Sequence, residues 1–396
     1  MVKKLIICIL CFTFSMFGIG VNAEEPGEAV TEEVTAEQEA VLEEVEADVE
    51  QPVVYGAAED FLADLNDDGY AELGKYKVEK IKDNVYHWDE ETKALPGGAT
   101  DDEGNMNNPS SMYFYVGETG VVLFDLGNGA AAGTQAEADA TTIVEAMTQG
   151  KPLTIVLTHG HPDHIGLGYS NEVFKNVTVE KVLLAQEDYE MGQAGIQQFI
   201  DAGIVEFVKD GDTVDIYGTN YDIYVVPCHT EGSLMISDTT NEVLYIGDTF
   251  GSGFIWALWD TYNDGNPLAA LSAGCTVARN IINGMPTCKI LAGHRWQQFW
   301  ANNPQRPNEM SIQYFNDMSQ VINGLMDGTT VSAPYSSVAW APDAIELSAN
   351  GAKAKIDTLP SIVEAYKQAV NAMDEAFVYS ATDKLSIETV NNAAAP

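Results

Sequence analysis

Residues 159–164 bring four potential metal ligands together in the order His-Gly-His-Pro-Asp-His. His159 and His161 are two positions apart, and the glycine and proline beside them make the turn irregular, so both imidazoles can converge on one ion. Asp163 and His164 follow at once and can serve a second ion. Neutral imidazole and carboxylate are ligands of zinc and similar transition metals, and a catalytic site keeps one position open for water. This cluster therefore predicts a metal site.

The residues just before the cluster predict the element that delivers it. Residues 154–157, Thr-Ile-Val-Leu, form a short apolar run of the kind buried in an α/β sheet, and no helical periodicity accompanies it. Strands of such sheets present functional side chains at their carboxyl ends. We therefore expect a buried strand to end at the metal site.

The spacing His-x-His-x-Asp-His resembles that of the metallo-β-lactamase superfamily, and the other motifs of the family can be matched in order along the chain. Asp125 resembles the first motif, His229 the third, Asp248 the fourth and His294 the fifth, and each follows an apolar, strand-like run. The chain has six histidines, and only His87 lies outside these motifs. Five motifs in the same order make the resemblance far more specific than one motif alone.

The resemblance covers residues 76–330 and implies an α/β (α+β) fold, a four-layer αββα sandwich of two mixed β-sheets flanked by helices. By the same resemblance the first metal would be held by His159, His161 and His229, the second by Asp163, His164 and His294, with Asp248 bridging the two and Asp125 bracing the metal loop. The expected ions are two of zinc, with iron or manganese as alternatives. Two divalent ions that share a water lower its pKa towards neutrality, so a bridging hydroxide would attack a carbonyl or phosphoryl centre, and Asp163 and Asp248 would take part in catalysis.

The ligand at the fourth motif narrows the choice within the family. Many true β-lactamases have cysteine or serine there, whereas an aspartate such as Asp248 resembles the glyoxalase II, lactonase and phosphodiesterase branches. The oxygen-reducing diiron branch usually has glutamate where this chain has His161. We therefore expect a secreted metal-dependent hydrolase of a small ester, lactone, thioester or phosphoester. The alternatives are a β-lactamase and a non-catalytic zinc-binding surface protein.

The ends of the chain differ in composition from its centre. Residues 1–23 have two lysines, an apolar run and a small-residue site before Glu24, which is the pattern of a secretory signal peptide, although a retained anchor is an alternative. Residues 24–58 are acidic and predict a disordered tether. Residues 59–345 would form the catalytic domain and residues 346–396 a helical extension. The protein would then be secreted or held at the cell surface.

The formal net charge of −41 disfavours nucleic acid as a partner, because phosphate backbones are bound by basic stripes. We expect a small-molecule substrate and, once the signal is removed, no integral membrane span; the sequence does not indicate an oligomeric state. Removal of the signal leaves three cysteines, an odd number that makes a disulfide framework unexpected.

Aromatic side chains lie close to the metal-ligand motifs. Trp256 and Trp259 come between the fourth and fifth motifs, and Arg295 and Trp296 directly follow His294. The tryptophans could form a hydrophobic wall over the metals, and Arg295 could bind a substrate carboxylate or phosphate. Ordinary packing and a surface salt bridge are the alternatives.

Residues 64–75 begin like a calcium loop, but Lys75 stands where a bidentate glutamate belongs, so we expect an acidic turn rather than a calcium site. The remaining pattern predicts strands or strand pairs over 76–88, 111–125, 177–185, 204–227, 234–246 and 336–347, helices over 134–149, 187–202, 307–326 and 356–376, and a loop over 93–110.

Overall fold

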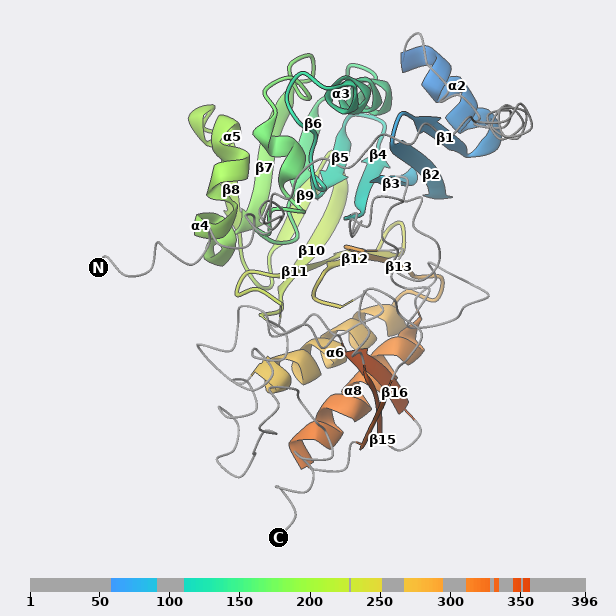
Figure 1. Ribbon diagram of the computed structural model, residues 1–396, viewed down its shortest axis with the longest axis vertical. Coiled ribbons are helices and arrows are strands. Elements are labelled where there is room, and N and C mark those ends of the chain that lie inside the picture. The colour runs from blue at the N-terminus through green and yellow to red at the C-terminus, as the bar shows by residue number, and fades with distance from the viewer. Residues whose placement is uncertain are drawn as a thin grey trace, which may run out of the picture. The chain divides into compact units, whose positions relative to one another are not determined.

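The computed structural model describes residues 58–90, 110–227, 229–250, 267–294, 311–327, 331–334, 345–349 and 352–356 (Figure 1). The predicted signal peptide, nearly all of the tether, most of the loop over 93–110 and nearly all of the helix over 356–376 lie outside the described residues. So do Trp256, Trp259, Arg295 and Trp296, whose predicted roles therefore stay predictions.

The first sheet contains the strand that carries the metal-ligand cluster. Its eight strands follow chain order: β1 (Tyr70–Leu73), β2 (Tyr76–Lys82), β3 (Val85–Glu90), β4 (Met112–Val116), β5 (Val121–Phe124), β6 (Leu153–Val156), β7 (Val179–Ala185) and β8 (Val205–Val208). Strands β1 to β5 pair antiparallel, and β5 to β8 pair parallel. The parallel strands β5 and β6 end level with each other, because Phe124 pairs with Val156, and β7 runs two residues further, from Leu183 opposite Val156 to Ala185.

The second sheet has five strands in the order β13-β12-β11-β10-β9. They are β9 (Thr213–Ile216), β10 (Thr219–Val225), β11 (Leu234–Asp238), β12 (Val243–Gly247) and β13 (Lys289–Ala292). Strands β12 and β13 pair parallel and the others antiparallel, so this sheet is also mixed. The predicted strands over 76–88, 111–125, 177–185, 204–227 and 234–246 are confirmed within a few residues at their ends.

Successive side chains of the first sheet point to opposite faces and so serve two cores. On β5, Val122 and Phe124 belong to the apolar layer between the sheets, where Phe124 stacks on Tyr245 of β12 with ring centroids 3.6 Å apart. Val121 and Leu123 of the same strand instead face the helical side. This alternation explains why β5 is apolar at every position: it is buried on both faces.

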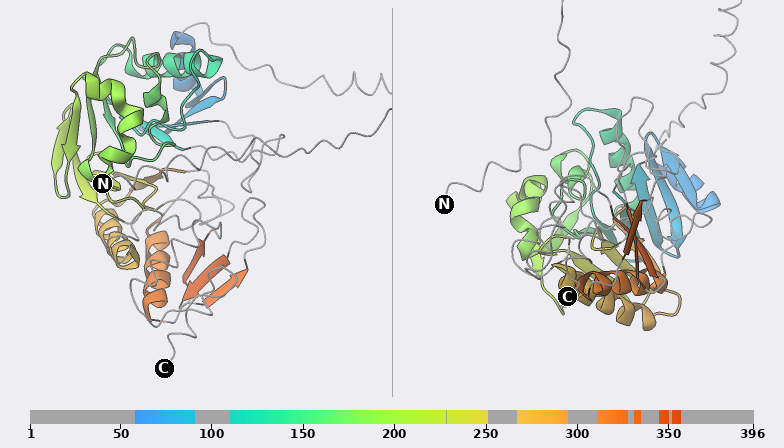
Figure 2. Two further views of the ribbon diagram at one scale, coloured as in Figure 1. Left: turned by 60° about the vertical axis from the view of Figure 1, so that its left-hand side comes forward. Right: turned by 60° about the horizontal axis from the view of Figure 1, so that its bottom comes forward.

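Helices cover the outer face of each sheet (Figures 1 and 2). On the first sheet lie α2 (Ala58–Asp68), which buries Phe61 and Leu65, and α3 (Gln135–Thr148), the helix predicted over 134–149. Thr134 caps the start of α3 and Gln149 ends it in the left-handed conformation. On the second sheet lie α6 (Pro267–Asn283) and α8 (Ile312–Asp327). Two mixed sheets with helices outside confirm the predicted fold class.

A third, small sheet lies against α8 and corrects the prediction for the end of the chain. It contains β14 (Val331–Pro334), β15 (Ile345–Ala349) and β16 (Ala352–Ile356), all antiparallel. The boundary predicted at 345/346 falls inside β15, and residues 346–349 and 352–356 of the predicted helical extension are strands. The sequence Asn-Gly between two alternating runs, Ile-Glu-Leu-Ser-Ala and Ala-Lys-Ala-Lys-Ile, is a hairpin signal that the helix prediction overlooked.

Two further expectations are corrected. Residues 64–68 lie on α2 and 70–73 in β1, so the acidic segment is a helix and strand rather than a turn or a calcium-type loop. Residues 187–202 form no single helix but the short elements η2 (Gln186–Asp188), α4 (Tyr189–Gly192), η3 (Gln193–Ile196) and α5 (Gln197–Asp201). The segment lies close to the metal loop: a Cβ on Gly195 would meet the Ile165 side chain at 2.5 Å, so a larger residue does not fit there.

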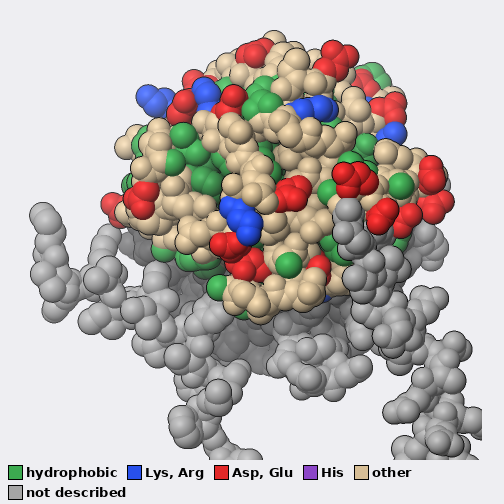
Figure 3. Space-filling view, turned by 90° about the horizontal axis from the view of Figure 1, so that it is seen from above, with side chains coloured by type: hydrophobic (Ala, Val, Ile, Leu, Met, Phe, Trp, Pro, Cys, Tyr) green, Lys and Arg blue, Asp and Glu red, His purple; other side chains and the backbone are tan. Residues whose placement is uncertain are grey.

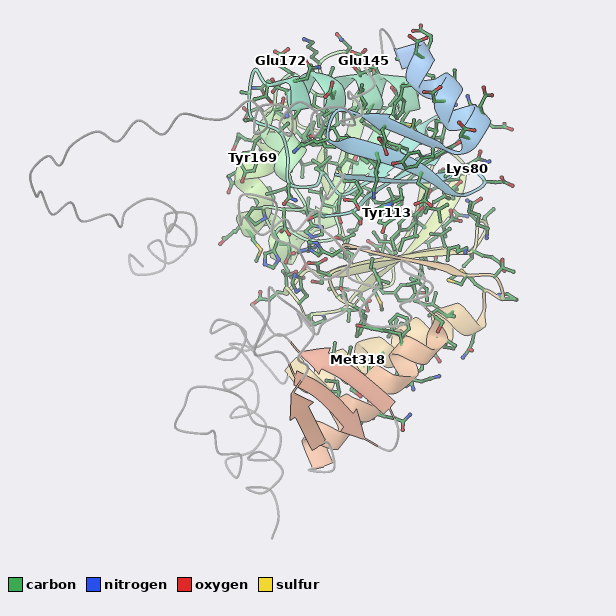
Figure 4. The ribbon with its side chains drawn as sticks, turned by 45° about the vertical axis from the view of Figure 1, so that its right-hand side comes forward. Lys80, Tyr113, Glu145, Tyr169, Glu172 and Met318 are labelled. Carbon is green, nitrogen blue, oxygen red and sulfur yellow. The ribbon has the colours of Figure 1, made fainter. Side chains whose placement is uncertain are left out.

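The described surface reflects the composition. On the face seen in Figure 3, acidic side chains are scattered among a few lysines. Figure 4 places Glu145 of α3 and Glu172 at the outer face of the first sheet, Tyr113 between the two sheets, and Met318 on α8 beyond the second sheet.

No helix in the described part of the chain combines the length and the apolar character needed to cross a membrane.

Candidate metal centre

The carboxyl ends of strands from both sheets meet at one edge and supply the candidate ligands. Asp125 directly follows β5, and the segment holding His159 follows β6. From the second sheet, Asp248 directly follows β12 and His294 lies just after β13. The sheets are joined here, since the amide of Leu234 at the start of β11 donates to the carbonyl of Thr158 at 2.8 Å.

Three overlapping groups of side chains offer metal ligands, with the ligand atoms of each group within 4.8 Å of one another. The first is His159, His161 and His229; the second is Asp163, His164 and His294; the third is His159, His164 and Asp248. The structure therefore brings together all seven residues that the sequence predicts as metal ligands.

Asp248 lies between the two predicted sets of metal ligands. Its Oδ1 is 3.4 Å from Nε2 of His164, and its Oδ2 is 3.6 Å from Nε2 of His229 and 3.1 Å from Nε2 of His294. On one side, Nε2 of His229 lies 2.9 Å from Nδ1 of His161. On the other, Nε2 of His294 lies 3.4 Å from Oδ2 of Asp163. One carboxylate thus contacts imidazoles of both sets.

Asp125 and Thr158 determine which ring nitrogen of His159 and of His164 can bind a metal. The Thr158 hydroxyl donates to Oδ2 of Asp125 at 2.7 Å, so the Oγ1 oxygen, 3.1 Å from Nδ1 of His159, accepts a hydrogen bond from that ring. Nδ1 of His164 donates directly to Oδ2 of Asp125 at 3.0 Å. Because Nδ1 of each ring is engaged in a hydrogen bond, Nε2 is the atom of each ring that can coordinate a metal. Such hydrogen bonds orient metal-binding histidines in proteins.

The donor atoms fit a metal. Nε2 of His159, Nε2 of His164 and Oδ1 of Asp248 are buried and make no hydrogen bond within the described residues. A buried lone pair without a partner is costly, and coordination of a cation would satisfy it. A Cβ on Gly293 would come within 2.1 Å of Oδ1 of Asp248, so only glycine lets this strand end approach the carboxylate.

The electrostatics of the site favour a cation. Burial lowers the pKa of His159 well below its ordinary value, and the nearby imidazoles of His164 and His161 lower it further, so this ring is neutral. Burial would raise the pKa of Asp248, but the imidazoles of His294 and His164 outweigh it and hold that pKa well below its ordinary value. Burial would lower the pKa of His294, yet Asp248 and the hydrogen bond with Asp163 raise it to about 10. The carboxylates of Asp163 and Asp248 thus favour positive charge on the imidazoles beside them. Bound metal ions would supply that positive charge in place of the protons.

Three polar residues around the site were not predicted. Thr158 links Asp125 to His159 as described, and its amide donates to Oδ1 of Asp125 at 2.7 Å. The Ser110 hydroxyl donates to Oδ2 of Asp163 at 3.2 Å. Asp188 follows the carboxyl end of β7, which pairs parallel with β6. Functional side chains often follow the carboxyl ends of parallel strands, so the position of Asp188 in the sequence could have indicated it.

His87, the histidine outside the motifs, lies on β3 and not among the three ligand groups. Its Nε2 is 2.8 Å from Oγ of Ser111 and 3.5 Å from Oδ2 of Asp89, and all three residues are buried. This separate position agrees with its exclusion from the predicted ligand set.

Comparison with known proteins points to one family. Residues 106–290 match the model of the metallo-beta-lactamase superfamily. A hydroxyacylglutathione hydrolase from Salmonella arizonae is 32% identical over 117 residues, which is 29% of this chain and 41% of the relative. One from Klebsiella pneumoniae is 33% identical over 106 residues, 26% of this chain and 36% of the relative. The chain thus spans about two fifths of the length of the curated relatives it matches.

Among solved structures, a metallo beta lactamase from Erythrobacter litoralis is similar to this chain at 15% sequence identity and a TM-score of 0.44. The similarity covers 64% of this chain and 99% of that one.

Proposed function

Because the chain carries a metallo-beta-lactamase superfamily domain, we propose that it is a dinuclear metal-dependent hydrolase that cleaves a small ester, lactone, thioester or phosphoester. The observation that carries this proposal is the position of Asp248, whose carboxylate contacts imidazoles of both ligand sets. A carboxylate that contacts imidazoles of both ligand sets is the arrangement expected of a bridging ligand.

Zinc fits the ligand set best, since imidazole nitrogen and carboxylate oxygen suit it, and iron or manganese are the alternatives. Two such ions, when bound, would lower the pKa of a water and polarise the bond to be cleaved. The chain's own residues hold the donors in place for this. Asp125 fixes the proton of His164 on Nδ1, and Thr158 does the same for His159. Neither ring can then turn away without losing a buried hydrogen bond.

The exposure of the ligands suggests where a substrate enters. The side chain of Asp163 is 31% exposed, whereas those of Asp248, His229 and His294 are 7% exposed or less. His161 is also half-buried, so a substrate would reach the site past Asp163 and His161. There the Asp163 carboxylate could orient the attacking water, with its Oδ2 fixed by the Ser110 hydroxyl.

A thioester is the first substrate class to test. Two observations support it: the relatives named above are hydroxyacylglutathione hydrolases, and the fourth motif carries aspartate at Asp248 rather than cysteine or serine. We also propose that the protein acts outside the cytoplasm, on the basis of the signal-like pattern of residues 1–23.

The test is a substrate panel with purified protein. Thioesters, aryl esters, lactones, phosphodiesters and a β-lactam are each assayed as purified, after chelation and dialysis, and after zinc, manganese or iron is restored. We expect hydrolysis of at least one ester-type substrate that chelation abolishes and metal restores. Turnover of the β-lactam alone would support a β-lactamase instead, and bound metal without any turnover would support a non-catalytic zinc protein.

A control separates lost activity from lost folding. Asp248→Ala removes the shared carboxylate. Asp238→Asn alters another buried aspartate, which ends β11 and accepts the amide of Asn241 at 2.9 Å, at the opposite end of that strand from the site. Asp238→Asn should retain metal-dependent activity per folded molecule, whereas Asp248→Ala should lose it. Equal loss in both variants would contradict a role for Asp248 in the reaction.

A further inference from the structure

A buried carboxylate outside the ligand set connects two of the metal loops. Asp188, at the end of η2, is 1% exposed and is not in any of the three groups of candidate ligands. It follows β7, whose carboxyl end lies beside that of β6. Because a buried carboxylate must be hydrogen-bonded to be tolerated, its partners indicate its task.

Asp188 accepts three hydrogen bonds, and they come from two loops. Its Oδ2 accepts from the amide of Gly160 at 2.9 Å, and Gly160 stands between His159 and His161. The same Oδ2 accepts from the Thr230 hydroxyl at 2.6 Å, and Thr230 directly follows His229. Oδ1 accepts from the amide of Gly232 in the same loop as Thr230 at 2.7 Å.

The backbone approaches Asp188 too closely for larger residues. A Cβ on Gly232 would lie 2.7 Å from Oδ1 of Asp188, and a Cβ on Gly160 would lie 2.8 Å from the backbone oxygen of Asp188. The backbones of the loops that contain Gly160 and Gly232 therefore pack directly against Asp188. The His159 and His161 loop and the His229 loop are held apart by the width of one carboxylate.

We propose that Asp188 is a positioning residue for the first metal: it sets the separation of the two loops that carry His159, His161 and His229. The inference rests on the proposed function, because it assigns those three histidines to one ion. Only an acceptor without hydrogens can serve all three donors. An asparagine in the same place must turn its NH₂ group towards at least one of them, and the loops must move apart.

The second metal provides an internal reference. None of the three hydrogen bonds of Asp188 goes to Asp163, His164 or His294 or to a residue next to them. A change at Asp188 should therefore weaken the first metal and leave the second close to its native affinity. A residue that merely supports the fold would not separate the two ions in this way.

The experiment measures metal binding rather than turnover. Apoprotein of the native chain, Asp188→Asn and the control Asp238→Asn is titrated with cobalt(II), and the ligand-field spectrum and a competing chelator give a dissociation constant for each ion. We expect Asp188→Asn to raise the dissociation constant of the tris-histidine ion by about 10–100-fold, with the second ion within about 2-fold of native. Asp238→Asn should change neither.

A second pair of variants keeps the test valid if Asp188→Asn does not fold. Thr230→Val removes the hydroxyl donor to Asp188, and Thr230→Ser retains it. Thr230→Val should weaken the first ion and Thr230→Ser should restore it. Unchanged binding of both ions in Asp188→Asn, or equal weakening of both, would overturn the inference while leaving the dinuclear site intact. Native protein that binds no cobalt would instead overturn the proposed function, and this inference with it.

Discussion

Oδ2 of Asp125 accepts a hydrogen bond from Nδ1 of His164 at 3.0 Å and also from the Thr158 hydroxyl at 2.7 Å. Asp125 adopts a positive φ of 60°, a conformation that aspartate tolerates better than most residues. The carboxylate that ends β5 therefore orients the imidazole of a candidate ligand that follows β6.

This relationship predicts the effect of Asp125→Asn. The amide must direct its NH₂ group at one of the three donors that Asp125 now accepts, so His164 or Thr158 loses its partner. We expect the dissociation constant of the bound metal to be about 10–100-fold higher than that of the native chain. Dialysis against graded concentrations of a chelator, followed by elemental analysis, measures this. Metal retention equal to that of Asp238→Asn would show that Asp125 only supports the fold.

Ser110→Ala tests the orientation of Asp163. The variant removes the hydroxyl that donates to Oδ2 of Asp163 but leaves every candidate ligand in place. We expect kcat to fall by about 10-fold, because a hydrogen bond to a charged group is worth on the order of 1.5–3 kcal/mol and this one is partly exposed. Bound metal should be unchanged. Steady-state kinetics beside metal analysis is the check, and a native kcat would mean that Asp163 is oriented without Ser110.

The layer between the sheets yields a prediction about stability. Tyr245 is buried and stacks on Phe124, and its hydroxyl makes no hydrogen bond with any described residue. Burial raises the pKa of Tyr245 well above its ordinary value, so the hydroxyl stays neutral. Tyr245→Phe should therefore leave the free energy of unfolding unchanged or raise it, whereas Tyr245→Ala should lower it by about 3–5 kcal/mol. Denaturant unfolding measures both; a clear destabilisation by Tyr245→Phe would show that the hydroxyl has a partner.

The sequence predicted much of the two sheets because burial on both faces leaves a simple pattern. Residues 121–124 form an apolar run that ends at Asp125, residues 154–157 form a largely apolar run that ends at Thr158, and the structure has β5 and β6 there. The convergence of His229, Asp248 and His294 on the 159–164 cluster followed from the resemblance, since ligands so far apart in the chain leave no local pattern that pairs them.

The features that the sequence did not indicate depend on contacts between residues far apart in the chain, and such contacts leave no pattern in the sequence. The partners of Asp188 lie 28, 42 and 44 residues away, and two of them are backbone amides of glycines. The interrupted helix over 187–202 likewise coincides with a close approach to a distant part of the chain, since Gly195 leaves no room for a Cβ beside Ile165 of the metal loop. The helix α6 was not among the predicted helices.

The central claim is that Asp248 is shared by two metal ions, and metal content tests it most directly. Elemental analysis of dialysed protein should find about two ions per native chain and about one per chain of Asp248→Ala, because the first set keeps three imidazoles while the second loses its bridge. Turnover of the variant should fall by a factor on the order of a hundred or more. A native chain that holds a single ion, or a variant that still holds two and turns over normally, would contradict the dinuclear account.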